Sequence, residues 1–263
     1  MQRMVKEAVS EKYDLTNIRH VVVGAAPVGQ ELCKEFVAKF PHVSTVSQGY
    51  GLTETAAATN MTPALPITDA KFNSCGILTP FFECKIIDLK TGEELKHNEQ
   101  GELCFKGPLC TLGYYKNAKA TAELYDKDGW LHTGDIGYYD EDEFFYIVDR
   151  LKELIKVKGF QVTPSELEEV LLTHPNIEEV TVIGIPDSEK GERPFAYVIA
   201  KSSLTAEEVA EYLSKSVAPI KRISPKDVAF VESLPKTSLG KPQRRMLQKM
   251  HNMHSVSTLK SKI

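Results

Sequence analysis

The order of apolar and polar positions predicts an open α/β layer at the start of the chain. Residues 18–23 include three consecutive valines and end at Gly24, as a buried parallel strand does when it leads into a ligand loop. A helix should follow, because apolar residues recur every four positions from Leu32 to Phe40. Residues 43–47 then read as a second short strand that leads into another glycine loop. Both glycine segments would lie at the carboxyl ends of neighbouring strands, where open α/β sheets bind their ligands.

Between about residues 75 and 149 the pattern changes to short strands separated by turns. Strands are expected at residues 84–87, 101–106 and 144–148, and one stretch, residues 118–125, reads as a helix. This pattern predicts an antiparallel barrel or a distorted sheet attached to the α/β layer.

Helices and strands alternate again in the last third of the chain. Residues 163–166 combine an N-cap, a proline at the first helical position and a glutamate at the third, which predicts the start of a helix. Residues 205–208 repeat the capping pattern for a second helix. Strands are expected between these helices, at residues 180–185 and 195–200, so this part should form a small α+β domain.

The composition is that of an ordinary globular protein, with 263 residues of which 42% are apolar and 26% charged. The longest apolar runs are far too short to span a bilayer, and the first residues lack the apolar stretch of a signal peptide. We therefore expect a soluble, intracellular protein of two domains, without a membrane span.

The five cysteines include no CxxC pair, and no histidine stands at metal-ligand spacing from them. This spacing argues against a zinc site, and the odd number without a framework predicts reduced thiols. Cys84 and Cys104 fall in expected strands, where a small buried apolar residue is a sufficient explanation for each.

Charge is distributed unevenly along the chain. Residues 152–263 hold 17 of the 32 Lys/Arg and 14 of the 36 Asp/Glu, a net charge of +3, which leaves 15 and 22, a net charge of −7, before them. Part of the basic excess is clustered near the end, at Lys236, Lys241, Arg244, Arg245 and Lys249. Such a cluster could hold the phosphates of a nucleotide or of CoA, or it could be a solvated helix face. Nucleic acid is disfavoured as a partner, because no aromatic residues are interleaved with these charges.

Six short motifs follow one another in a fixed order. They are Val23-Gly24-Ala25-Ala26-Pro27, Gln48-Gly49-Tyr50-Gly51-Leu52-Thr53-Glu54, Gly101-Glu102-Leu103 with Gly107 and Gly113-Tyr114, His132-Thr133-Gly134-Asp135, residues 149–156 running into Lys158-Gly159-Phe160-Gln161, and residues 234–241. Together they resemble the adenylate-forming family of acyl-CoA synthetases, 4-coumarate:CoA ligases and beetle luciferases. The resemblance covers roughly residues 1 to 250.

This resemblance implies a fold class, α/β, and a set of domain boundaries. Residues 1–149 would be the C-terminal part of a layered adenylation domain, with an α/β part at 1–75 and a β-barrel-like subdomain at 76–149. Residues 150–152 would form a hinge, 153–250 a small mobile α+β C-terminal domain, and 251–263 a flexible tail. The family's phosphate loop, of the form T-S-G-T-T-G-x-P-K-G, does not occur in the sequence. That difference suggests a truncated synthetase, a partial gene model or a split product.

The family reaction has two halves: a carboxylate attacks ATP to give an acyl adenylate, and a thiol then displaces AMP. Because the first half brings an anion onto a polyanion, fixed positive charge and positioning should lower its barrier. The resemblance assigns that charge to Lys241, which would bridge the substrate carboxylate and the α-phosphate. Glu54 would hold Mg²⁺, and Thr53 would donate to a phosphate oxygen.

The resemblance also assigns the nucleoside site. Asp135, helped by Arg150, would accept the ribose hydroxyls, and Tyr50 would stack on the base. The remaining wall residues would be Gly24, Ala25, Ala26, Gln48, Gly49, Gly51 and Leu52. Taken alone, Asp135 could be a turn residue and Arg150 a member of a surface ion pair.

In the thiol step the small domain would rotate about Lys152 and carry Lys241 away from the site. Lys156 and Gln161 would then act in thioester formation. The path of CoA would be lined by Lys158, Gly159 and Phe160. The alternative is a strand whose lysines merely face water.

The implied function is an ATP-dependent acid:CoA ligase of the 4-coumarate:CoA ligase type. Its cofactors would be ATP, Mg²⁺ and coenzyme A, and its substrate a small carboxylic acid whose identity the sequence does not define. Two alternatives stay open: a non-catalytic product that acts as a binding or regulatory module, and a luciferase-like monooxygenase.

The last three residues suggest a cellular address. Ser261-Lys262-Ile263 is a conservative variant of the Ser-Lys-Leu peroxisomal signal and follows a polar stretch, residues 254–260, that we expect to be disordered. A peroxisomal import receptor is therefore an expected partner. Without such import the protein would be cytoplasmic.

Overall fold

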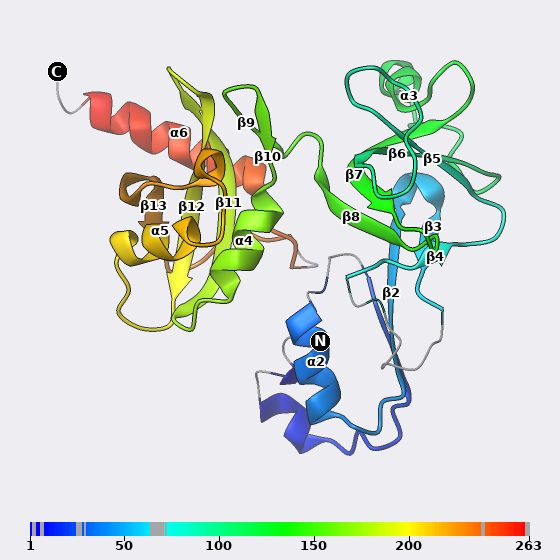
Figure 1. Cartoon of the computed structure of the whole chain (residues 1–263), viewed down its shortest axis with the longest axis horizontal. Helices are drawn as coiled ribbons and strands as arrows, with labels where there is room; N and C mark the ends of the chain where they lie inside the picture. Colours follow the sequence, from blue (N-terminus) through cyan, green and yellow to red (C-terminus); the bar gives the residue numbers. More distant parts are fainter. Residues whose placement is uncertain are drawn as a thin grey trace. The chain divides into compact units, whose positions relative to one another are not determined.

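The chain divides into two compact units, Met1–Val148 and Asp149–Ile263 (Figure 1). The computed structural model describes residues 1, 4–5, 8–24, 28, 30–63, 71, 73–237 and 240–260.

The first unit begins with a mixed four-stranded sheet in the order β1-β2-β3-β4. Strand β1 pairs in parallel with β2, and β3 and β4 continue the sheet antiparallel. The helix between the first two strands confirms the expected strand, helix, strand order. The elements are η1 (Ala8–Lys12), β1 (His20–Val23), α2 (Gln30–Lys39), β2 (Thr45–Leu52), η2 (Thr53–Thr55), β3 (Ala57–Met61) and β4 (Ile77–Leu78).

The sequence predicted that the valines of β1 are buried on both faces of the sheet. In the structure only one face is covered. Val21 and Val23 pack on the cluster that contains Phe36 and Phe40, whereas Val22 is 66% exposed. Successive side chains of a strand point to opposite faces, so the cluster with the two phenylalanines of this region buries only one face of β1.

The motif at residues 48–54 was expected as a loop and is mostly a strand. Strand β2 continues to Leu52 because Gly49, Tyr50 and Gly51 pair with β3, with a register shift between Tyr50 and Gly51. A Cβ atom on Gly49 would lie 3.4 Å from the carbonyl oxygen of Asn60, at the near edge of ordinary contact. Glycine here fits a strand whose neighbour approaches closely.

The second sheet of this unit is antiparallel, in the order β5-β6-β7-β8. This order corresponds to the distorted-sheet alternative, since its first and last strands are not neighbours. Phe82, Leu103, Phe105 and Phe145 form its core. The expected helix is confirmed, but β7, which carries the motif at residues 132–135, was missed. The elements are β5 (Glu83–Ile87), β6 (Gly101–Lys106), α3 (Ala118–Leu124), β7 (Leu131–Tyr139) and β8 (Phe145–Arg150).

The second unit has one five-stranded sheet, in the order β10-β9-β12-β11 with β13 beside β12. Strands β11 and β12 form a long hairpin, so they extend beyond the expected strands. Its elements are β9 (Ile155–Val157), β10 (Phe160–Val162), α4 (Pro164–Leu172), β11 (Ile177–Asp187), β12 (Gly191–Ala200), α5 (Ala206–Ser214), η4 (Pro219–Lys221), η5 (Pro225–Asp227), β13 (Val228–Phe230) and α6 (Arg244–Lys260). The predicted α+β character is confirmed.

The two capped helices begin where expected, through different contacts. At α5 the capping box is complete, with Glu208 N–H donating to Thr205 Oγ1 (3.2 Å) and Thr205 N–H to Glu208 Oε2 (2.8 Å). At α4 the side chain of Thr163 makes no cap bond, and Asp149 instead accepts from Ser165 N–H (3.1 Å) and Ser165 Oγ (2.9 Å). Asp149 thus satisfies an otherwise orphaned donor of the first turn.

Helix α6 continues to Lys260 and so includes residues 254–260, which we expected from the sequence to be disordered. The segment 244–260 contains neither glycine nor proline, so nothing in its backbone interrupts the helix. Among the helices of the described ranges, none is both long and apolar enough to cross a membrane.

Candidate functional site

The glycines at the ends of β1 and β2 lie side by side. Val23 is the register partner of Gln48, and a Cβ atom on Gly24 would stand 3.4 Å from the carbonyl oxygen of Gly49. The amide of Gln48 accepts from Val28 N–H and donates to Val28 C=O, each at 3.3 Å. Gln48 therefore holds the backbone of Val28. Ala25 and Ala26, assigned to the adenine wall, lie outside the described residues.

Tyr50 and Asp135, assigned to the nucleoside, are in direct contact. The Tyr50 hydroxyl donates to Asp135 Oδ2 at 2.6 Å, and Asp135 is only 4% exposed. Burial, followed by the negative charge of Asp135, raises the pKa of Tyr50 above its ordinary range. The phenol therefore stays protonated and fixes the position of the carboxylate that the sequence assigned to the ribose.

The backbone beside Asp135 is held by a residue that was quoted in a motif but given no role. Glu102 Oε1 accepts from Gly134 N–H at 2.9 Å, and Glu102 Oε2 lies 3.0 Å from His132 Nδ1. Thr133 adds a hydroxyl bond to Leu103 C=O at 2.8 Å. The sequence would have indicated this role for Glu102 only if the strand with Gly-Glu-Leu were already known to pair with the strand that carries His-Thr-Gly-Asp.

Glu54, assigned to Mg²⁺, lies in η2 beside the loop that carries Tyr114. The Tyr114 hydroxyl donates to Glu54 Oε1 at 2.6 Å, and Thr111 N–H donates to Glu54 C=O at 2.7 Å. This hydrogen bond to Glu54 raises the pKa of Tyr114. A carboxylate and the neighbouring Thr53 hydroxyl are hard oxygen donors of the kind that Mg²⁺ prefers, so the residues fit the expected ion.

The two residues assigned to the thiol step face each other across a hairpin. Lys156 in β9 is the register partner of Gln161 in β10, and both are exposed, while Ile155, Val157 and Val162 are buried. The alternation of the hairpin therefore puts the lysine and the glutamine on one face. This geometry suits both a catalytic pair and a strand whose polar side chains face water.

The turn of this hairpin carries the residues assigned to CoA. Lys158 has φ +50° and Gly159 φ +81°, the two positive values of a type I′ turn. Lys158 N–H donates to Lys190 C=O at 2.7 Å, which ties the turn to the β11–β12 connection. Phe160 is 63% exposed, an unusual place for so large an apolar side chain.

Lys241 lies on a tight loop before α6. Gly240 has φ +82°, Gly240 N–H donates to Thr237 C=O (2.9 Å), and Thr237 N–H donates to Lys241 C=O (2.8 Å). The backbone is thus closed on itself, while the half-buried Lys241 side chain forms no ion pair with a residue of the described ranges. Ser238 and Leu239 fall outside those ranges.

Both ends of the Lys241 loop are anchored by ion pairs. Lys236 lies 2.6 Å from Glu179, and Arg244 lies 2.7 Å from Glu153 and 2.6 Å from Glu168. Arg244 also donates to Val182 C=O at 3.2 Å. Burial raises the pKa of Glu168, and the guanidinium opposes that rise. The loop is therefore firmly attached and carries a lysine that has no ion pair within the described ranges.

Arg150 and Lys152 stand at the start of the second unit. Arg150 N–H donates to Asp149 Oδ1 at 2.7 Å, and Glu153 N–H donates to Arg150 C=O at 2.9 Å, which closes the turn that contains Lys152. Asp135 belongs to the first unit, so an action of Arg150 together with Asp135 stays a prediction, as does the hinge at Lys152.

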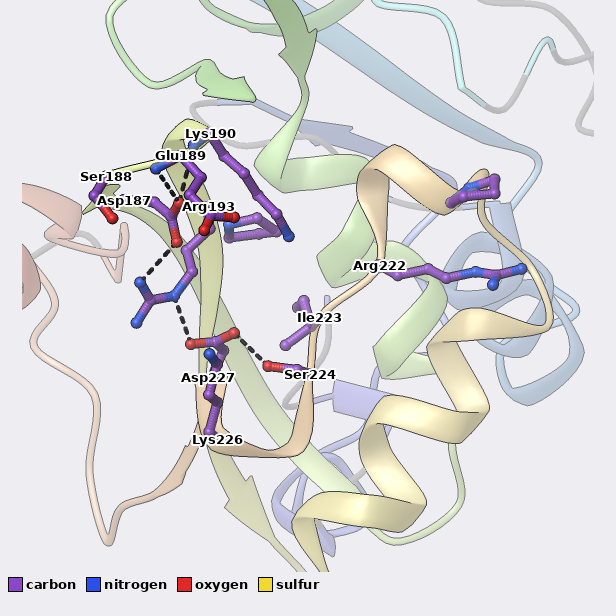
Figure 2. A pocket seen from close by; sticks show the side chains of 12 residues that line it. Asp187, Ser188, Glu189, Lys190, Arg193, Arg222, Ile223, Ser224, Lys226 and Asp227 are labelled. Carbon is purple, nitrogen blue, oxygen red and sulfur yellow. Dashed lines mark hydrogen bonds and ion pairs between the residues drawn. The ribbon is translucent and has the colours of Figure 1, made fainter. Parts of the chain in front are cut away.

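A separate recess of about 590 Å³ lies at the β11–β12 turn (Figure 2). Arg193 points between two carboxylates, at 3.1 Å from Asp187 and 2.7 Å from Asp227. Lys190, Arg222 and Lys226 also line it, together with Glu189. Its charges nearly cancel, so the recess is a weak site for an anion.

Two family models match the chain. Residues 1–115 match the AMP-binding enzyme family and residues 166–241 the AMP-binding enzyme C-terminal domain. These two matches lie in different units of the structure.

Similar proteins include a luciferase and a ligase. Luciferin 4-monooxygenase of Photinus pyralis is 46% identical over 247 residues, 93% of this chain and 44% of the relative. A 4-coumarate–CoA ligase of Nicotiana tabacum is 45% identical over 249 residues, 93% of this chain and 45% of the relative. The chain thus spans less than half the length of these relatives.

Among solved structures, o-succinylbenzoate CoA synthetase of Bacillus subtilis, in complex with an acyl-adenylate intermediate, has a TM-score of 0.76 at 31% identity. The match covers 88% of this chain and 46% of the other. With matches to both family models, and with relatives similar over nine-tenths of its length, the chain belongs to the family of AMP-binding, adenylate-forming enzymes.

Proposed function

We propose that this chain works in an ATP-dependent acid:CoA ligase of the 4-coumarate:CoA ligase type. The observation that carries the proposal is the presence in one chain of two complementary parts: a buried carboxylate positioned by a phenol, Asp135 with Tyr50, and an ammonium without an ion pair among the described residues, Lys241, on an anchored loop. A ligase needs both, because it must hold a nucleoside and neutralise two anions that react with each other. The similarity to a 4-coumarate–CoA ligase supports the same activity.

In the first half-reaction, the carboxylate oxygen of the acid attacks the α-phosphorus of ATP, and pyrophosphate leaves. Asp135 accepts the ribose hydroxyls while Tyr50 keeps its carboxylate in place. Lys241 neutralises the approaching carboxylate and the α-phosphate, which lowers the barrier mainly through electrostatic stabilisation. Glu54 and Thr53 would hold Mg²⁺, which shields phosphate charge when bound.

In the second half-reaction, the thiol of CoA attacks the acyl carbon, and AMP leaves. Rotation about Lys152 withdraws Lys241 and presents the β9–β10 hairpin. Lys156 and Gln161, paired across that hairpin, act on the reacting groups. Lys158, Gly159 and the exposed ring of Phe160 line the pantetheine path. The second unit thereby presents the Lys241 loop in the first half-reaction and the β9–β10 hairpin in the second.

Release of products tests the ligase. Protein that contains this chain is incubated with ATP, Mg²⁺, CoA and a panel of aromatic, medium-chain and long-chain acids, and AMP and pyrophosphate are measured. Release that depends on one class of acid supports the proposal and identifies the substrate. Absence of acid-dependent release across the panel contradicts it.

Binding of AMP to the 263-residue chain gives a test that needs no turnover. We expect Asp135→Asn to weaken binding about tenfold, because an amide replaces the acceptor of the ribose hydroxyls. AMP binding that depends on Asp135, without any pyrophosphate release, would instead identify a non-catalytic nucleotide-binding module.

A luciferase-like monooxygenase is the second candidate, because luciferin 4-monooxygenase of Photinus pyralis is 46% identical to this chain. It would share the adenylation step and replace the thiol step by oxidation. Light emission with luciferin, ATP and Mg²⁺ in the absence of CoA separates the two. The ligase proposal predicts no light above the level of a Lys241→Ala control.

We also propose peroxisomal import through Ser261-Lys262-Ile263, which lie outside the described residues. A fluorescent fusion that retains this C-terminus should accumulate in peroxisomes. Removal of Ile263 should leave it in the cytoplasm, and peroxisomal signal that survives this removal would disprove the address.

A further inference from the structure

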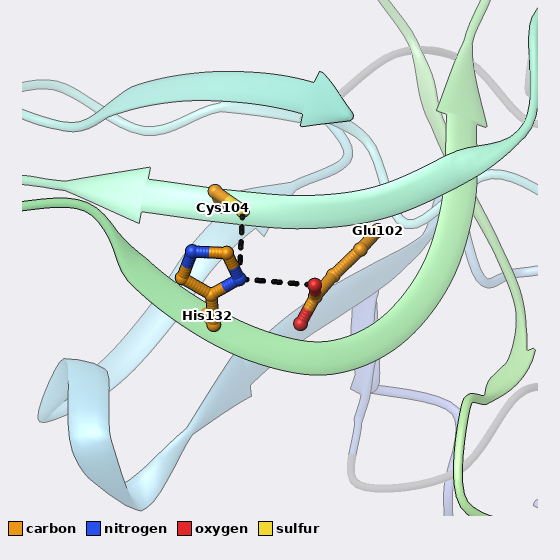
Figure 3. A group of neighbouring side chains, drawn as sticks. All are labelled: Glu102, Cys104 and His132. Carbon is orange, nitrogen blue, oxygen red and sulfur yellow. Dashed lines mark hydrogen bonds and ion pairs between the residues drawn. The ribbon is translucent and has the colours of Figure 1, made fainter. Parts of the chain in front are cut away.

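Three side chains with metal-binding chemistry converge on the inner strands of the β5–β8 sheet. Glu102 and Cys104 come from β6 and His132 from β7, and their donor atoms all lie within 4.8 Å of one another (Figure 3). Cys104 and His132 are register partners, and Glu102, two residues away along β6, points to the same face. The proximity arises from strand pairing, which is why residues 28 positions apart gave no signal in the sequence.

The separations fit a zinc ion. His132 Nδ1 lies 3.0 Å from Glu102 Oε2 and 3.7 Å from Cys104 Sγ. Zinc bonds of about 2.0–2.3 Å to nitrogen, oxygen and sulfur, arranged tetrahedrally, place ligand atoms about 3.3–3.7 Å apart. Two of the three donor separations thus stand near the required spacing, and the third, between Glu102 and Cys104, is at most 4.8 Å.

The surroundings orient these ligands as the second layer of a metal site does. Asp126 Oδ2 lies 3.8 Å from His132 Nε2, the ring nitrogen that faces away from the cluster. Asp126 is itself fixed by Lys85 at 3.2 Å and by Trp130 N–H at 2.9 Å. A metal-bound histidine usually directs its other N–H to such a carboxylate, and since 3.8 Å is an ion-pair separation and longer than a hydrogen bond, a small shift of the ring would complete that bond. Glu102 is fixed in the same way, through Gly134.

Of the three side chains, that of His132 is the most exposed to solvent. Cys104 is fully buried and the Glu102 side chain is 11% exposed, whereas the His132 side chain is 28% exposed. An ion could therefore enter past the imidazole and keep a water as its fourth ligand.

We propose that Glu102, Cys104 and His132 form a binding site for a single zinc ion, with water as the fourth ligand. On binding, the Cys104 thiol releases its proton to solvent, and His132 carries its remaining proton on Nε2, toward Asp126. Glu102 Oε1 keeps its bond to Gly134, so the ion ties together the segment that leads into Asp135. Neither the thiol nor the imidazole has a part in the acid:CoA ligase reaction proposed above.

Cobalt replaces zinc as a coloured probe in the test. The purified 263-residue chain is titrated with Co²⁺, and we expect a thiolate-to-cobalt charge-transfer band that saturates at one equivalent and disappears on addition of Zn²⁺. Cys104→Ser should abolish the band, and Glu102→Gln should weaken binding at least tenfold. The matched control is Cys110→Ala, which removes a partly exposed thiol elsewhere in the same unit and should leave the titration unchanged.

A band that survives in folded Cys104→Ser, or no band in the unaltered chain, would overturn the proposal. Should the serine variant fail to fold, X-ray absorption of the zinc-loaded unaltered chain decides instead. One sulfur together with imidazole nitrogen is expected, and coordination by nitrogen and oxygen alone refutes the site.

Discussion

Two candidate acids of the first unit already have a hydrogen-bond partner, whereas two candidate lysines of the second unit have no ion partner among the described residues. Asp135 and Glu54 each accept a tyrosine hydroxyl at 2.6 Å. Lys241 and Lys156 form no ion pair within the described part of the chain, although the loop of Lys241 and the hairpin of Lys156 are themselves well fixed. The difference indicates that the carboxylates of one unit are held in position before a ligand binds, whereas the ammonium groups of the other can still pair with a ligand.

Loss of the Lys241 charge should have the largest effect on activity. We expect Lys241→Ala to reduce acid-dependent pyrophosphate release by about 10²–10³-fold, because the charge that offsets the two reacting anions is gone. Thermal unfolding should barely change, since the side chain has no ion partner among the described residues. The matched control is Lys236→Ala, which removes a lysine of the same loop that is paired with Glu179. Equal losses in the two variants would contradict the special role of Lys241.

Loss of Arg244, which anchors the Lys241 loop, should lower the stability of the second unit. Arg244→Ala leaves Glu168 buried without its partner, and we expect the second unit to lose about 3–5 kcal/mol of unfolding free energy in urea denaturation. The double change Arg244→Met with Glu168→Met should recover part of this loss, because the buried charge at residue 168 is gone and Glu153, the other partner of Arg244, has a side chain that is 28% exposed and can be solvated. If the double variant is as unstable as the single one, the ion pair is not the cause.

Loss of the Tyr50 hydroxyl, which positions Asp135, should lower the unfolding free energy less than loss of Arg244. Tyr50→Phe removes a bond to a carboxylate that is 4% exposed, and we expect a loss of about 1–3 kcal/mol in thermal unfolding. Tyr114→Phe removes the equivalent bond from a phenol that is 41% exposed, and it should cost less than about 1 kcal/mol. A reversed order of these two losses would show that burial does not decide them.

The smallest effect should come from the hairpin turn. Lys158→Asn puts the preferred residue at the first position of a type I′ turn, so we expect the second unit to gain about 0.5 kcal/mol of stability. The same change should raise the KM for CoA if Lys158 contacts it. A stabilised variant with an unaltered KM would remove Lys158 from the CoA path while leaving the turn assignment intact.

Local periodicity and capping patterns predicted much of the fold. The helix after β1 and the complete capping box at Thr205 follow from contacts close in sequence, and the parallel pairing of β1 with β2 follows from the strand, helix, strand order. The strand character of residues 48–52 could not be predicted, because it depends on pairing with β3. Val22 was misjudged for a related reason: burial depends on what covers each face of a sheet.

The candidate site was predictable only through its motifs. The family resemblance named Tyr50, Asp135 and Lys241, but not which of them touch. The roles of Glu102 and Arg244 depend on partners 32 and 91 positions away, and no local pattern reports such distances. Longer-range pairing is also what brings Cys104 beside His132.

The carboxylate of Asp149 bridges the segment that contains Lys152, because its partner, Ser165, lies on the far side of that residue. A swivel at Lys152 would have to open both bonds, whereas a swivel before Asp149 would leave them intact. Each bond to a charged group contributes about 1.5–3 kcal/mol. Ser165→Ala removes the hydroxyl bond and keeps the backbone one, so it should ease a swivel at Lys152 and quicken AMP release, and an unchanged rate would place the pivot ahead of Asp149.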